Sequence, residues 1–164
     1  MNQPLRLGIA GLGTVGAGVV KIIQSKSELL RLRTGRDIEI VAVSARSAGK
    51  DRGVDLSAYR WHGDPISLAQ SDDIDVFVEL VGGDEGPAKD ATEAALKSGK
   101  DVVTANKAML AHHGQPLAEL AEGNGLTIRY EAAVAGGHPN HQIPDRGIGG
   151  KQNQTRYGRD EWHL

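Results

Sequence analysis

Three glycines behind the first apolar run restrict the fold more than any other feature. Residues 5–11 read LRLGIAG, a short β-type run, and the segment GLGTVGAG places Gly11, Gly13 and Gly16 in G-x-G-x-x-G spacing. Between a strand and a helix, the first glycine allows a tight turn, the second lets the backbone approach a pyrophosphate, and the third lets the helix pack close to the strand. The stretch predicts a strand, a turn and a helix whose N-terminus can bind phosphates. The alternative is a turn without a ligand.

Strand-type and helix-type runs alternate after this motif. The alternation predicts an α/β fold, a doubly wound Rossmann-type parallel sheet with helices on both faces and ligands at the carboxyl ends of the strands. Outside the runs, Trp61 and His62 are expected in a loop near the place where the adenosine end of a bound dinucleotide would lie. His112 and His113 are expected in a surface loop. The strand-type runs are residues 5–11, 37–45, 75–83, 100–106 and 126–137, and the helix-type runs are residues 14–33, 65–74, 86–99 and 114–125.

The end of the second strand bears on the choice between NAD and NADP. An NAD-binding domain usually has an acidic residue there, which binds the ribose 2′-hydroxyl. Here VAVSARSAGK carries Ser44, Arg46, Ser47 and Lys50 and no Asp or Glu. A hydroxyl and two cations suit a 2′-phosphate, which Arg binds through paired hydrogen bonds. We predict NADP as the cofactor; use of both dinucleotides and an ordinary solvated loop are the alternatives.

Composition excludes several classes of protein. The chain has 19 basic and 21 acidic residues and a net charge of −2, which argues against a general nucleic-acid binder. Without cysteine there is no disulfide framework and no cysteine metal site. No apolar stretch is long enough to span a bilayer, and the N-terminus lacks a signal-peptide cleavage region. We therefore expect a cytoplasmic protein with no nucleic-acid or membrane partner.

Five segments in a fixed order add a more specific indication. GLGTVGAGVV, VAVSAR, VFVELVGG, DVVTANKAMLA and YEAAVAGG together resemble the nucleotide-binding half of homoserine dehydrogenases, over residues 5–137. The resemblance implies NAD(P)H-dependent reduction of L-aspartate 4-semialdehyde to L-homoserine, on the route to threonine and methionine. It also implies that the intact enzyme is a homo-oligomer. The alternatives are another NAD(P)-dependent dehydrogenase of this fold and a non-catalytic nucleotide-binding module.

The resemblance implies roles for individual residues. Gly13, Thr14 and Val15 contact the cofactor pyrophosphate, on the turn that Gly11 and Gly16 shape.

Further along the chain, the resemblance places Arg46 at the adenosine ribose or its phosphate, and Gly82 and Gly83 along the cofactor cleft. It places Lys107 near the nicotinamide and the substrate, as the catalytic candidate for handling the proton or the substrate carbonyl. Asn106 shapes the turn that presents Lys107. A surface lysine in a loop after a strand is the alternative.

The segment EAAVAGG has a second implied role, a sodium site. The Glu131 side chain and the carbonyl groups of Val134, Gly136 and His138 supply the oxygens, which hard cations prefer. This chain has His138 where the family has an aliphatic residue. The alternative for Glu131 is a solvated or paired carboxylate at a strand end.

After Gly137 the family pattern stops. Residues 138–164 hold only Ile143, Ile148 and Leu164 as aliphatics and show no helical or strand period. Codons exist for this tail that, read one base later, translate as IPIIKSLTEGLAGNKIKRVMGGMNGT, the continuation expected for the family. We hypothesise a single-base frameshift near codon 138.

The frameshift hypothesis sets the expected domain organisation. Residues 1–137 form a dinucleotide-binding domain, residues 138–164 form a non-native tail, and the substrate and dimerisation domain is missing. Hydride transfer needs substrate and nicotinamide in near-attack geometry. We therefore expect this polypeptide alone to bind cofactor with little or no turnover.

Overall fold

The structure is a computed structural model of the chain that describes residues 2–83 and 85–130. In this part of the chain, six parallel strands form one sheet in the order β3-β2-β1-β4-β5-β6. The strands are β1 (Leu5–Ala10), β2 (Ile38–Ser44), β3 (Arg60–His62), β4 (Val76–Glu79), β5 (Asp101–Thr104) and β6 (Ile128–Tyr130). The helices are α1 (Thr14–Ser25), α2 (Ser27–Thr34), α3 (Pro65–Ala69), α4 (Pro87–Lys97) and α5 (Lys107–Gly123).

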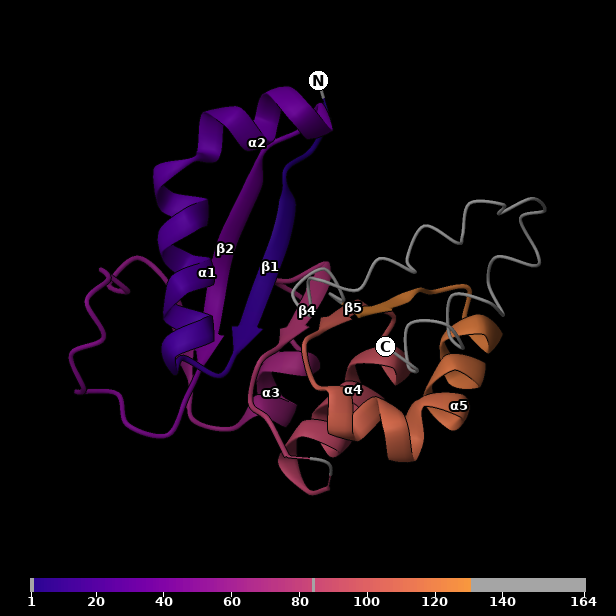
Figure 1. Cartoon of the computed structure of the whole chain (residues 1–164). Coiled ribbons are helices and arrows are strands. Elements are labelled where there is room, and N and C mark those ends of the chain that lie inside the picture. Colours follow the sequence, from indigo (N-terminus) through magenta and orange to yellow (C-terminus); the bar gives the residue numbers. More distant parts are fainter. Residues whose placement is uncertain (1, 84, 131–164) are drawn as a thin grey trace, which may run out of the picture.

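The helices cover the sheet from two sides. Helices α1 and α2 lie on one side, and α3, α4 and α5 pack together on the other (Figure 1). The chain builds β1, β2 and β3 outward in one direction and then crosses to β4 on the other side of β1. The strand order therefore reverses between β1 and β4, as predicted for a doubly wound fold, and this is where such sheets bind ligands.

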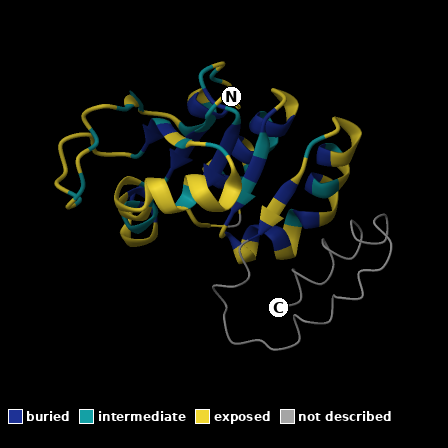
Figure 2. Ribbon diagram, turned by 90° about the horizontal axis from the view of Figure 1, so that it is seen from above, coloured by how far each residue is buried: buried dark blue, intermediate teal, exposed yellow. Residues whose placement is uncertain are grey.

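Two apolar cores follow from the alternation of side chains along each strand. Ile9 and Val43 belong to the core under α1, whereas Ala10 and Ala42, their neighbours in the chain, belong to the core under α3, α4 and α5. Phe77 of β4 is fully buried in the second core. Figure 2 shows the buried sheet in dark blue between helices whose outer surfaces are yellow. Because both faces are covered, the strands read as nearly continuous apolar runs.

The helix predicted at residues 14–33 is two helices. The Ser25 hydroxyl lies 2.8 Å from the Lys21 carbonyl oxygen, and Lys26 then leaves helical geometry with φ −118°. A hydroxyl bonded back to the preceding turn competes with the backbone ladder and bends helices. The predicted stop is confirmed, because Gly35 ends α2 in the left-handed region at φ +80°.

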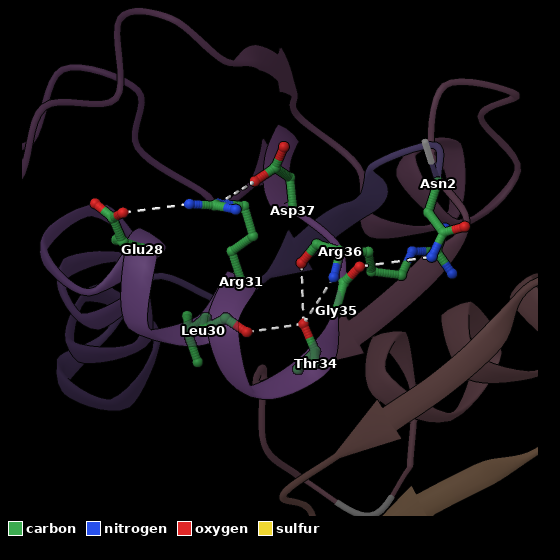
Figure 3. A network of polar contacts seen from close by, with 8 residues as sticks. All are labelled: Asn2, Glu28, Leu30, Arg31, Thr34, Gly35, Arg36 and Asp37. Carbon is green, nitrogen blue, oxygen red and sulfur yellow. Dashed lines mark hydrogen bonds and ion pairs between the residues drawn. The ribbon is translucent and has the colours of Figure 1, made fainter.

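Polar contacts close the turn between α2 and β2 (Figure 3). Arg31 pairs with Glu28 at 3.2 Å and with Asp37 at 3.6 Å. The Thr34 hydroxyl lies 2.8 Å from the Leu30 carbonyl oxygen. These exposed contacts lie at the amino end of β2, and none of the predicted site residues is among the residues drawn there.

Two segments predicted as loops are regular structure. Trp61 and His62 belong to the edge strand β3 and pair with Val43 and Ser44 of β2. Helix α5 begins at Lys107 rather than at residue 114, so it also contains His112 and His113.

Local chemistry explains the early start of α5. The Asn106 side chain caps the helix by accepting a hydrogen bond from Met109 N at 3.0 Å. The cap and the buried Met109 and Leu110 hold the first turns, although Pro116 inside the helix removes one backbone donor. The boundary predicted after Gly137 and the tail at residues 138–164 lie outside the described residues.

Candidate functional site

One row of residues ends the strands at the carboxyl edge of the sheet. The register pairs Ala10 of β1 with Ser44 on one side and with Glu79 on the other, and the pairing continues outward to both edges. The loops that leave this row therefore lie side by side. In sheet order the row is His62, Ser44, Ala10, Glu79, Thr104 and Tyr130.

Gly11 and Gly16 are required by close backbone packing at the predicted turn. Gly11 has φ +100°, and a Cβ atom on it would lie 2.4 Å from the Leu80 carbonyl oxygen. A Cβ atom on Gly16 would lie 1.9 Å from the Gly11 carbonyl oxygen. Both distances are to backbone atoms, which cannot move aside as a flexible side chain can. The structure thus gives these two glycines a role in the fold itself.

Gly13 differs from the other two glycines of the motif. It is exposed, its φ of −78° is open to any residue, and a Cβ atom on it would meet nothing within 4 Å. Thr14 and Val15 follow it as exposed residues in the first turn of α1, which carries no acidic residue and no side-chain cap. The free N–H groups and the positive end of the helix dipole can therefore receive an anion.

Arg46 lies on the β2 side of this turn. The Gly11 N–H donates to the Ser44 carbonyl oxygen at 2.9 Å, which holds the end of β2 beside the glycine turn. Two residues later the exposed Arg46 leaves the sheet edge, followed by exposed Ser47 and Lys50. Arg46 thus stands on the β2 side of the point where strand order reverses.

Gly82 and Gly83 lie on the opposite side, in the loop after β4. Both are exposed and both have positive φ, +90° and +85°. The Asn106 side chain donates to the Gly83 carbonyl oxygen at 2.5 Å. This bond joins the loop after β4 to the loop after β5.

Lys107 is exposed at the first position of α5, directly after Asn106. The structure brings the loop with Gly82 and Gly83 next to the start of α5, where Lys107 lies, and Asn106 provides both the cap of α5 and the contact with Gly83. Arg46 is on the other side of β1. The two groups flank the glycine turn rather than forming one cluster.

Sequence reasoning missed Glu79 and Thr104. Both side chains are completely buried, and the Thr104 hydroxyl donates to the Glu79 carboxylate at 2.5 Å. The carboxylate also accepts from backbone N–H groups of the loop after β4. The signal was present in the sequence, since VFVELV places one acidic residue inside an otherwise apolar strand, where a charge needs partners.

The predicted sodium ligands Glu131, Val134, Gly136 and His138 lie outside the described residues. Within residues 2–83 and 85–130, no cluster of three or more His, Asp or Glu side chains is suited to a metal ion. The helices in the same ranges include none with the length and apolar character needed to cross a membrane.

Comparison with known sequences gives one consistent family. Residues 11–131 match the family model described as the homoserine dehydrogenase NAD-binding domain. The homoserine dehydrogenase of Neisseria gonorrhoeae is 42% identical over 137 residues, which are 84% of this chain and 31% of that protein. That of Bacillus subtilis is 40% identical over 146 residues, 89% of this chain and 34% of that protein. The chain spans about a third of the length of these relatives.

Solved structures agree with the sequences. A homoserine dehydrogenase from Thiobacillus denitrificans superposes with a TM-score of 0.78 at 34% identity, covering 89% of this chain and 33% of that one. The S. aureus enzyme at pH 7.5 gives 0.72 at 38% identity, covering 79% and 32%. A hyperthermophilic archaeal homoserine dehydrogenase mutant in complex with NADPH gives 0.67 at 25% identity, covering 86% and 48%.

Proposed function

Because the chain belongs to the family of the homoserine dehydrogenase NAD-binding domain, we propose that it binds NADP(H) at the carboxyl edge of its sheet. The observation that carries this proposal is the open space around Gly13, directly before the uncapped and exposed first turn of α1. That space lies where the strand order reverses. A pyrophosphate fits there because it needs backbone N–H donors, a positive dipole and no Cβ atom in its path.

The residues on the two sides of the glycine turn indicate which end of the dinucleotide binds on each side. Arg46, with Ser47 and Lys50, supplies charge and hydroxyl groups for a ribose 2′-phosphate, which supports NADP over NAD. The loop with Gly82 and Gly83 then faces the nicotinamide end, next to Lys107. This direction follows the general rule for doubly wound sheets, in which the cofactor crosses the reversal point.

For the whole enzyme we propose the family reaction, reduction of L-aspartate 4-semialdehyde to L-homoserine. In this reaction the hydride would come from NAD(P)H when it is bound. Lys107 is exposed at the first position of α5 and carries a proton donor on a flexible stem. It can polarise the carbonyl oxygen or deliver the proton that oxygen takes up. Lys107 is thus the residue of this chain proposed to touch the reacting atoms.

Three further proposals rest on family membership alone. They are a sodium ion held by Glu131 and the carbonyl groups of Val134, Gly136 and His138, a homo-oligomeric intact enzyme, and a cytoplasmic location. The proposed place of the reaction is in threonine and methionine biosynthesis.

A titration with matched glycine variants tests the cofactor site. NADPH is added to the chain and to the variants Gly13→Ala and Gly18→Ala, and binding is measured by calorimetry. Gly18 lies in α1, five residues after Gly13, and also has nothing within 4 Å of an added Cβ atom. We expect Gly13→Ala to raise the Kd for NADPH about tenfold or more, because the new methyl group would cost at least one hydrogen bond between the backbone and the charged pyrophosphate. Gly18→Ala should leave the Kd unchanged; an equal effect of both, or no saturable binding to the parent chain, contradicts the proposal.

A further inference from the structure

We propose that Glu79 is a positioning residue, whose buried carboxylate fixes the two loops that border the nicotinamide side of the cleft. The proposal rests on the proposed function, because it concerns the geometry of that cofactor site. Glu79 ends β4 in the row at the carboxyl edge and has no exposed surface. It therefore cannot act on substrate directly and must act through the groups it holds.

Three donors converge on this one carboxylate. Its Oε2 accepts from Val81 N at 2.9 Å and from Gly82 N at 3.1 Å. Its Oε1 accepts from the Thr104 hydroxyl at 2.5 Å. Hydrogen bonds to a carboxylate are stronger than neutral ones, and the buried setting makes their loss costly.

The contacts continue from Thr104 to the turn that presents Lys107. The Thr104 Oγ accepts from Asn106 N at 2.9 Å, and the Asn106 side chain donates to the Gly83 carbonyl oxygen at 2.5 Å. The hydrogen bonds form a ring. They link Glu79 to Thr104, Thr104 to Asn106 and Asn106 to Gly83, and Gly82, the chain neighbour of Gly83, bonds back to Glu79. These contacts join the loops after β4 and β5 to one another.

A simpler interpretation is that Glu79 only satisfies buried polar groups. The contacts argue for more, because two of its three donors are backbone amide groups of the exposed loop with Gly82, and the third, the buried Thr104, also holds the backbone of Asn106. A binding loop that is already ordered loses less conformational entropy when the ligand arrives. The prediction is thus an effect on the nicotinamide half of the dinucleotide and not on its adenosine half.

Replacing the carboxylate by an amide is the sharpest change. Glu79→Gln keeps the size of the side chain but puts an NH₂ group where one of the two acceptor oxygens was. Either the Val81 and Gly82 amide groups or the Thr104 hydroxyl then loses its acceptor. Glu39→Gln is the matched control, since Glu39 is an exposed residue of β2.

The first readout is amide hydrogen exchange in the chain without cofactor. We expect Glu79→Gln to speed exchange at Val81, Gly82 and Asn106 while the amide groups of β1 keep the parent rate. Glu39→Gln should change none of them. Unchanged exchange at all three loop amides overturns the proposal, whatever the chain binds.

The second readout compares NADP⁺ with adenosine 2′,5′-bisphosphate, which lacks the nicotinamide half. Glu79→Gln should raise the Kd for NADP⁺ about tenfold, an equilibrium change of 1.4 kcal/mol, and leave the Kd for the bisphosphate as in the parent. An equal rise for both ligands, or no rise for NADP⁺, overturns the positioning role. If the parent chain binds neither ligand, the proposed function fails, and the exchange measurement still decides whether Glu79 holds the loops.

A second pair of variants covers the case in which Glu79→Gln does not fold. Thr104→Val keeps the shape of the side chain without its hydroxyl, and Thr104→Ser keeps the hydroxyl. We expect Thr104→Val to reproduce the loop exchange and the selective loss of NADP⁺ affinity, and Thr104→Ser to rescue both. Equal behaviour of the two variants overturns the proposal.

Discussion

At the scale of single residues, the three motif glycines divide into two kinds. Gly11 and Gly16 are surrounded by backbone at distances that exclude a Cβ atom, whereas Gly13 faces open space. The first two serve the turn and the close approach of α1 to β1. The third precedes the uncapped first turn of α1, where we propose that the pyrophosphate binds.

Gly16→Ala should unfold or strongly destabilise the chain. The new methyl group would overlap the Gly11 carbonyl oxygen at 1.9 Å, and overpacking of this kind costs about 3 kcal/mol or more when backbone must move. Gly18→Ala in the same helix should instead stabilise by up to about 1 kcal/mol through helix propensity. Urea denaturation followed by circular dichroism measures both. A Gly16→Ala variant as stable as Gly18→Ala would show that the turn is packed differently.

Arg46→Gln should change the choice of dinucleotide. Removing the guanidinium takes away charged hydrogen bonds to the 2′-phosphate, so the Kd for NADPH should rise about tenfold to a hundredfold. The Kd for NADH, which lacks that phosphate, should stay the same. Parallel titrations with the two reduced cofactors measure the ratio. Equal changes for NADPH and NADH would remove Arg46 from the 2′-phosphate site.

The sequence located these residues unevenly. The glycine spacing and the missing acid after β2 are local signals, and the structure places Gly13 and Arg46 on neighbouring loops at the same edge. The contact between Glu79 and Asn106 could not be predicted from the sequence. It runs through Thr104 and forms only when β4 and β5 pair in register. Contacts of that kind depend on tertiary structure.

At the scale of elements, an ion pair joins the start of β4 to β1. Arg6 donates to Asp75 through its backbone N–H at 2.9 Å and through its guanidinium at 2.9 and 3.2 Å. The hydrogen bonds from the Arg6 side chain hold the pKa of the Asp75 carboxyl below its usual range, against the smaller opposing effect of burial. This pair therefore stabilises the two strands that flank the point where the strand order reverses.

Acid should weaken this contact in a defined window. A lowered pKa means that the stabilisation is complete above the ordinary value of about 4 and is lost as the pH falls through the lower pKa of the folded state. Asp75→Asn should lower the urea midpoint at neutral pH and flatten its dependence on pH below about 4. Urea midpoints of parent and variant across this range give the comparison. Parallel pH curves would show that Asp75 does not contribute.

The elements themselves were largely predictable, and the exceptions have physical reasons. Buried parallel strands are recognisable as apolar runs, and helix ends are recognisable by glycines such as Gly35 after α2. β3 has three residues at a sheet edge, too few to show a period. The start of α5 was hidden because Gly114 and Pro116 suggested a later beginning, whereas the Asn106 cap and burial of Met109 hold the earlier turns.

At the scale of the whole molecule, the chain corresponds to about a third of its relatives. The match to the family model ends at residue 131, whereas the alignment with the Bacillus subtilis relative covers 89% of the chain and extends past Gly137. The frameshift hypothesis concerns residues 138–164, which lie outside the described structure. It explains the change of sequence pattern by one event, a single-base shift of the reading frame, and it can be checked in the DNA sequence of the gene.

Sequencing the gene across codon 138 tests that hypothesis. We expect that a one-base change there opens a downstream frame that begins IPIIKSLTEGLAGN. The product of the restored frame should reduce aspartate semialdehyde with NADPH. The 164-residue chain spans about a third of the length of its relatives and should show no measurable turnover, because hydride transfer needs substrate and nicotinamide held in near-attack geometry. A gene with no such frame, or turnover by the chain itself, would contradict the hypothesis.

The binding site at the carboxyl edge is the claim on which the rest depends, and an amide-resolved NMR titration with NADPH tests it most directly. The account predicts saturable shifts at Thr14 and Val15 in the first turn of α1 and at Gly82 and Gly83 after β4, with little change at Thr34 and Asp37 on the amino edge. Saturable shifts confined to the amino edge, or none at the α1 turn, would contradict it.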